Sequence, residues 1–105
     1  MVIIETHAFS NRLAKLLTAE EYRQLQRELI IRPDIGKLIQ GSGGLRKVRF
    51  GYEGKGKSGG VRICYYWHQA RDIILLLFIF PKNEQSDLSK DQLGKLRKMV
   101  EEEYK

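Results

Sequence analysis

Apolar and polar residues alternate along two stretches near the middle of the chain, and this period-two pattern predicts two β-strands. In residues 45–50 the apolar side chains largely share one parity, whereas Lys47 and Arg49 share the other. Residues 61–68 alternate in a similar way, and a loop rich in glycine and lysine joins the two stretches. We therefore expect a hairpin with one face in the core and a basic face toward solvent.

Three other stretches carry apolar residues every three or four positions, which predicts amphipathic helices. The first covers residues 9–17, the second follows Thr18 and the third follows Ser89. Pro33 cannot continue the second helix, so we expect this helix to end near residue 31 or 32. Two capping boxes, in which Ser or Thr precedes Glu or Gln by three residues, mark helix starts: Thr18 with Glu21, and Ser89 with Gln92.

Two further apolar runs complete the expected fold. Residues 2–5 form a short first strand, and residues 73–80 are apolar at every position, which is typical of a central strand covered on both faces. The order of elements is then β-α-α-β-β-β-α within a single domain, residues 1–105. We expect an α+β fold with a largely antiparallel sheet and with the helices packed on one of its faces.

The composition is that of a soluble globular protein, with 42% hydrophobic and 30% charged residues among 105. The longest apolar run is far shorter than the roughly 20 residues of a membrane-spanning helix, and no secretory leader is recognisable. We therefore expect a cytoplasmic protein with no membrane partner. The one cysteine, Cys64, lies within an apolar strand and is predicted to be a small buried hydrophobic residue.

The positive charge is concentrated on the expected hairpin and the strand after it. Residues 45–81 carry seven Lys or Arg and two acids, and thus contribute +5 of the net charge of +6. A basic patch on a small rigid sheet is the electrostatic footprint of a polyanion partner, with nucleic acid as the first candidate and an acidic protein as the second. A face that merely confers solubility is the alternative.

The sequence argues against two other kinds of site. Residues 51–58 match the P-loop pattern G-x-x-x-x-G-K-S, but a P-loop must open into a helix, and a strand is expected here. We therefore expect no nucleotide cofactor. The two histidines, His7 and His68, have no ligand-like spacing with each other or with Cys64, so we expect no metal and no other cofactor.

Three motifs together resemble a known family: LRKVR at residues 45–49, GKGKSGGVRICYY at residues 54–66, and KNEQSDL at residues 82–88. They are similar to the HigB-like branch of the RelE/ParE toxin superfamily, and the similarity extends over nearly the whole chain. The resemblance implies a RelE-like fold and a toxin of a type II toxin–antitoxin system. Such a toxin cleaves mRNA in the ribosomal A site without a metal. The implied partners are mRNA, the ribosome and a cognate protein antitoxin.

Metal-free cleavage of RNA needs a base for the attacking 2′-hydroxyl, cations for the charge on phosphate and an acid for the departing 5′-oxygen. By resemblance, Arg62 matches a phosphate-stabilising arginine, and Lys47 and Arg49 match two strand lysines. The predicted catalytic residues are Lys55, Lys57, Arg62 and Lys82. The predicted RNA-binding residues are Arg46, Lys47, Arg49 and Tyr66. Mutual repulsion disfavours the charged form of a lysine, so the candidates for the base are Lys47, Lys55 and Lys57.

Several alternatives stay open at this point. Asn83 and Ser89 stand where the best-known ribonuclease members have an arginine and a tyrosine, so the acid is not identified. Glu84 and Asp87 are either local substitutes or caps of the last helix. Tyr66 either stacks on a base or is a half-buried aromatic residue.

Two other functions are compatible with the same fold. ParE-like toxins bind DNA gyrase without catalysis, although they lack the basic cluster expected here. A non-catalytic RNA- or ribosome-binding module would carry the same charges, because these give affinity whether or not a proton is transferred.

Overall fold

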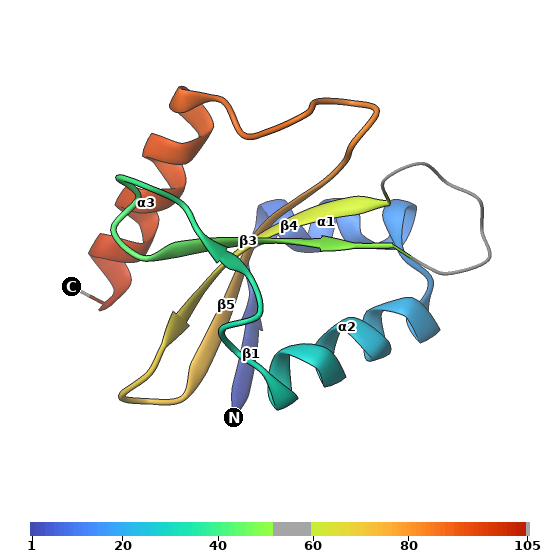
Figure 1. Ribbon diagram of the computed structural model, residues 1–105, viewed down its shortest axis with the longest axis horizontal. Coiled ribbons are helices and arrows are strands. Elements are labelled where there is room, and N and C mark those ends of the chain that lie inside the picture. Colours follow the sequence, from blue (N-terminus) through green and yellow to red (C-terminus); the bar gives the residue numbers. More distant parts are fainter. Residues whose placement is uncertain (52–59, 105) are drawn as a thin grey trace.

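The computed structural model describes residues 1–51 and 60–104. Its strands form one twisted sheet, and its helices lie around this sheet (Figure 1). In chain order the elements are β1 (Val2–Glu5), α1 (His7–Leu16), α2 (Ala19–Ile31), β2 (Lys37–Leu38), β3 (Leu45–Phe50), β4 (Val61–His68), β5 (Ile73–Pro81) and α3 (Lys90–Tyr104). The strands lie in the order β1-β5-β4-β3-β2, and only the β1–β5 pair among them is parallel. The α+β class and the largely antiparallel sheet are confirmed. The short β2 is an addition to the expected order.

The helices begin and end close to the expected residues. The side chain of Thr6 accepts a hydrogen bond from the backbone N–H of Phe9, so α1 begins two residues before the expected start. Both capping boxes are confirmed: Thr18 with Glu21 before α2, and Ser89 with Gln92 before α3. α2 ends at Ile31, as Pro33 requires. None of the helices in the described part of the chain is long and apolar enough to cross a membrane.

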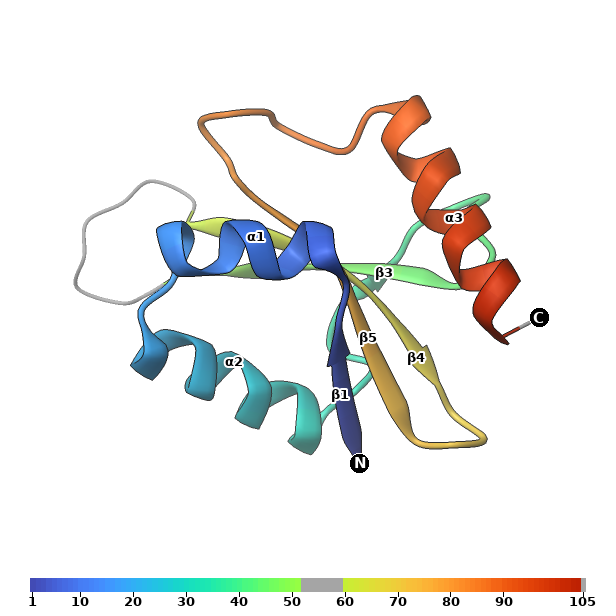
Figure 2. The same cartoon turned by 180° about the vertical axis from the view of Figure 1, so that it is seen from behind.

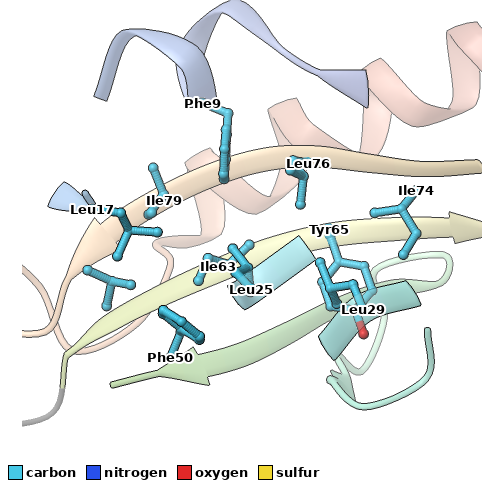
Figure 3. Packing of buried hydrophobic residues seen from close by; sticks show 11 residues of the cluster. Phe9, Leu17, Leu25, Leu29, Phe50, Ile63, Tyr65, Ile74, Leu76 and Ile79 are labelled. Carbon is cyan, nitrogen blue, oxygen red and sulfur yellow. The ribbon is translucent and has the colours of Figure 1, made fainter. Parts of the chain in front are cut away.

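α1 and α2 cover one face of the sheet, where the larger core cluster lies (Figure 3). Phe9 of α1 and Leu29 of α2 pack in the same cluster as Ile63 and Tyr65 of β4, and all four side chains are fully buried. In β4 the members of this cluster fall on odd-numbered residues, as the period of two requires. This face is therefore the apolar side of the expected hairpin.

The hydroxyl of Tyr65 ties the segment between α2 and β2 to the sheet. It accepts a hydrogen bond from the backbone N–H of Gly36 at 2.8 Å and donates to the carbonyl of Pro33 at 2.7 Å. A Cβ on Gly36 would lie 2.7 Å from the Tyr65 ring, so only glycine allows this close approach. Arg46 of β3 adds a hydrogen bond to the Gly36 carbonyl at 2.8 Å.

α3 lies on the opposite face of the sheet, and the expectation that all helices share one face is wrong. Leu96 and Val100 of α3 are buried in a second core cluster with Cys64 of β4 and with Leu75 and Leu77 of β5. α2 and α3 stand on opposite sides of the strands in both views (Figures 1 and 2). The fully apolar β5 is thus covered on both faces, each by different helices.

A β-bulge separates the two halves of the β4–β5 pair. Cys64 is opposite Phe78 and Tyr65 is opposite Leu76, so Leu77 is an extra residue in β5. Leu77 and Phe78 consequently both contribute to the cluster on the α3 face. Beyond the bulge, Phe80 is opposite Arg62.

Candidate functional site

Three predicted site residues lie on one face of the β3–β4 pair. Lys47 is opposite Cys64, and Arg49 is opposite Arg62, in the antiparallel register. Side chains that are directly opposite extend to the same face, and Cys64 belongs to the core cluster on the α3 side. Lys47, Arg49 and Arg62 are therefore together on the α3 face, and we call these three residues the basic cluster.

Arg62 is the buried member of the basic cluster. Its side chain is 6% exposed, whereas Arg49 is exposed. It is flanked by Arg49 on β3 and by the buried Phe80 on β5. A guanidinium stays charged in such surroundings and presents a fixed fork of N–H donors that fits two oxygens of one anion. Because the surroundings are poor in water, its attraction to an anion is stronger than at an exposed site.

The carboxylate of Asp87 lies against the basic cluster. Lys47 Nζ donates to Asp87 Oδ2 at 2.8 Å. This hydrogen bond is the largest cause of the lowered pKa of Asp87, and the backbone N–H of Leu88 and the charge of Arg62 lower it further, against the effect of desolvation. The basic cluster thus already holds one oxyanion that belongs to the protein itself.

Lys82 joins this region through the backbone. Its N–H donates to the carbonyl of Gly60 at 3.3 Å, and Phe80, two residues earlier, is opposite Arg62. Gly60 has φ +53°, and a Cβ there would lie 2.4 Å from the carbonyl oxygen of Phe50, so this passage requires glycine. The exposed Lys82 therefore follows β5 at the end of the sheet that carries Arg62.

Two described site residues, Arg46 and Tyr66, lie apart from the basic cluster and from Lys82, and two further predicted site residues are not among the described ones. Lys55 and Lys57 fall within residues 52–59, outside the described residues. Arg46 lies on the opposite face of β3, where its guanidinium donates to backbone carbonyls of the segment before β2. Tyr66 is half-buried and stacks on Tyr104 of α3, with ring centroids 6.0 Å apart. Hydrogen bonds to backbone carbonyls explain the position of Arg46, and stacking on Tyr104 explains that of Tyr66. The roles of both residues in RNA binding stay predictions.

Among the described residues of this face, the cysteine is not placed to react, and no group of side chains is placed to bind a metal ion. Cys64 is 1% exposed, and burial raises the pKa of its thiol to about 12, far above that of reactive cysteines. The expectation of a small buried residue is confirmed. In residues 1–51 and 60–104, no three His, Cys, Asp or Glu side chains are grouped so that they could hold a metal ion.

Two acidic residues have contacts that the sequence does not reveal. Asp87 does not cap the last helix, because Ser89 is the capping residue of α3 and Asp87 binds Lys47. Glu84 accepts hydrogen bonds from the guanidinium of Arg12 in α1. These partners are 40 and 72 positions apart in the chain, so no local pattern could have indicated them.

Comparison with protein families gives one match to this chain. The family described as "RelE toxin of RelE / RelB toxin-antitoxin system" matches residues 34–105, which is more than half of the chain. The matched region begins after α2 and contains the whole basic cluster together with Lys82.

Two solved structures show the same fold. A mutant of the E. coli toxin RelE in the free state has a TM-score of 0.62 and 14% sequence identity, over 90% of this chain and 94% of that one. The toxin–antitoxin complex RelBE of E. coli has a TM-score of 0.56 and 16% identity, over 76% of this chain and 94% of that one. At these identities the likeness concerns the arrangement of helices and strands.

Proposed function

Because the chain belongs to the RelE toxin family, we propose that it is the ribosome-dependent endoribonuclease of a type II toxin–antitoxin system. It cleaves mRNA in the ribosomal A site without a metal and so inhibits translation. Residues 1–105 act as one toxin domain in this proposal. Assignment to the HigB-like branch stays a prediction.

One observation carries the proposal, namely the basic cluster next to Lys82. The family match alone does not locate a reaction, whereas a buried arginine among cations on one sheet face is suited to a phosphate. The contact between Lys47 and Asp87 supports this reading, since the cluster binds an oxyanion of the protein. The opposite face of the same strands packs against α1 and α2, so a phosphate cannot reach it.

The proposed reaction uses the RNA's own 2′-hydroxyl as the nucleophile. The 2′-oxygen bonds to the adjacent phosphorus, the bond from phosphorus to the 5′-oxygen breaks, and a 2′,3′-cyclic phosphate and a 5′-hydroxyl result. Arg62 and Lys82 contact the scissile phosphate and stabilise the charge that develops on it. Lys47, Arg49, Lys55 and Lys57 supply backbone contacts, the base that takes the 2′-proton and the acid that protonates the 5′-oxygen.

The proposal includes three macromolecular partners. mRNA and the ribosome bind at the face of the sheet that carries the basic cluster, because their phosphates are attracted to its Lys and Arg side chains. A cognate protein antitoxin silences the toxin, and the RelBE complex, whose toxin has a similar fold, supports such a partner. These partners place the protein in the cytoplasm, and the reaction needs no cofactor.

A translation reaction with purified ribosomes and a defined mRNA tests the proposal, with 5′ ends mapped by primer extension. Wild type is compared with Arg62→Ala and with Arg23→Ala, a control at an exposed arginine of α2. Cuts inside the reading frame that require ribosomes are expected for wild type and for the control. Arg62→Ala should slow them by roughly 10²–10³-fold, as for the loss of one preorganised electrostatic donor. Circular dichroism checks that the variants are folded.

Other outcomes distinguish the alternative functions. Inhibition of purified DNA gyrase without any RNA cleavage would replace the proposal by a ParE-like activity. Ribosome binding without cleavage by the wild type would leave a non-catalytic binding module. Equal cleavage by wild type and Arg62→Ala would keep the activity and remove Arg62 from the site.

A further inference from the structure

The side chain of Arg12 in α1 reaches the segment that follows β5. Its guanidinium donates to both carboxylate oxygens of Glu84, to one of them at 2.7 Å. It also lies over the ring of Phe78, 5.0 Å from the ring centroid, an arrangement that favours a cation. Arg12 is 31% exposed and Glu84 is 44% exposed, so the contact lies at the edge of the sheet rather than in the core.

The segment from Lys82 to Leu88 carries one cation and two acids. Asp87 is bound to Lys47 of β3, and Glu84 is bound to Arg12 of α1. Each acid is thus held by a cation from another element. In the described part of the chain, no carboxylate lies within ion-pair distance of the Lys82 ammonium.

Glu84 is nevertheless the acid nearest to Lys82 along the chain. The two residues are separated by one position in a turn, in which the Glu84 N–H donates to the Pro81 carbonyl at 3.1 Å. Opposite charges this close attract each other, and a carboxylate beside Lys82 would compete with a phosphate for its ammonium. The contact with Arg12 directs the Glu84 carboxylate toward α1 instead.

We propose that Arg12 is a positioning residue, which holds Glu84 away from Lys82 and so keeps the Lys82 ammonium available to an RNA phosphate. The inference rests on the proposed function, because it concerns a residue assigned there to the scissile phosphate. Arg12 acts through Glu84 and takes no part in proton transfer. Neutralising Glu84 therefore makes Arg12 dispensable.

The cleavage arm of the test compares Arg12→Ala, Glu84→Gln and the double variant in the ribosome reaction. Arg12→Ala should lower kcat by roughly tenfold, less than the outright loss of an electrostatic donor. Glu84→Gln and the double variant should stay within about threefold of wild type, since neither has a carboxylate to capture Lys82. Lys15→Ala, which removes a cation three residues later in α1, is the matched control and should have no effect.

The outcomes separate this inference from a direct contact between Arg12 and RNA. A double variant as slow as Arg12→Ala, or a rise in KM at constant kcat, would mean that Arg12 contacts RNA itself. Arg12→Lys keeps the charge and should retain most activity, which guards against a variant that simply fails to fold. Activity of Arg12→Ala equal to that of Lys15→Ala would overturn the inference.

A structural arm tests the inference even if the proposed function fails. In a crystal structure of Arg12→Ala, the Glu84 carboxylate should lie within ion-pair distance of Lys82. A Glu84 side chain that remains directed toward α1 would overturn the inference whatever the catalytic result. Absence of cleavage by the wild type would overturn the proposed function instead, so the two failures are distinguishable.

Discussion

Alternate residues of β3 and β4 form the two faces of this strand pair, and the two faces have different roles. The face under α1 and α2 is closed by apolar side chains such as Ile63 and Tyr65. The α3 face is divided: Cys64 lies in the core cluster under α3, whereas Arg49 and Arg62 lie toward the other end of the strands. Residues that stabilise the fold and residues that we propose to act on RNA therefore alternate along these strands, and their side chains lie on opposite faces of the sheet. Substitutions on the two faces should separate stability from activity.

The largest expected effect is on the face that packs against α1. Leu76 of β5 is fully buried there, so Leu76→Ala should lower the free energy of unfolding by about 3 kcal/mol, within the 2–5 kcal/mol usual for such cavities. Urea denaturation measures this change. Cleavage per folded molecule should be unchanged at a temperature where the variant is folded. A comparable loss of specific activity would contradict the separation of the faces.

The next effect is on activity, at the buried arginine of the other face. Arg62→Lys keeps a positive charge but loses the planar fork of donors, so cleavage should fall by about a hundredfold, or ~2.7 kcal/mol of transition-state stabilisation. The measurement is the single-turnover rate on ribosome-bound mRNA. Near-normal cleavage would show that a charge at this position is sufficient and that bidentate contact is not used.

A smaller loss of stability is expected at the Tyr65 hydroxyl, a polar group of the packed face that holds the segment before β2. Tyr65→Phe removes a hydroxyl that contacts both Gly36 and Pro33. Because two backbone groups lose their partner, unfolding should become easier by about 2 kcal/mol. Thermal unfolding and hydrogen exchange at the Gly36 amide measure the loss. Protection of that amide equal to the wild type would contradict the assigned contact.

The smallest expected effect concerns pH and the contact between Lys47 and Asp87. The pKa of Asp87 is lowered in the folded protein, chiefly by Lys47, so the contact stabilises the fold above roughly pH 4 and is lost as pH falls through the lowered value. Asp87 is 56% exposed, so solvent screening limits the effect to less than about 1 kcal/mol. Asp87→Asn should remove this part of the acid dependence in denaturation curves between pH 7 and pH 2. An unchanged acid dependence would argue against the contact in solution.

Periodicity predicts the elements of this fold well but not their arrangement. The capping box at Thr18 and the stop before Pro33 are local signals, and both are confirmed. The uniformly apolar β5 shows only that both of its faces are covered. It does not say which helix covers which face, because the packing of α3 depends on contacts distant in sequence. β2 has only two residues and no hydrophobic period, which explains why it was not expected.

The same reasoning holds for the candidate site. Period two places Lys47 and Arg49 on one face of β3, and the register places Arg62 of β4 on the same face, opposite Arg49. Arg46 belongs to the same basic motif, but its parity sends it to the other face. The contacts of Glu84 and Asp87 join distant elements, and a sequence read locally cannot indicate them. The assignment of base and acid stays a prediction.

The parallel pairing of β1 with β5 also determines when, during synthesis of the chain, the sheet can be completed. Val2 is opposite Ile73, so β1 has no partner in the sheet until β5 has been translated. Contacts between residues this far apart form late, because a long loop must close before they are gained. The five-stranded sheet is therefore complete only after β5 has been made. Under the proposed function, we expect that a nascent chain that does not yet contain β5 cannot cleave the mRNA from which it is made.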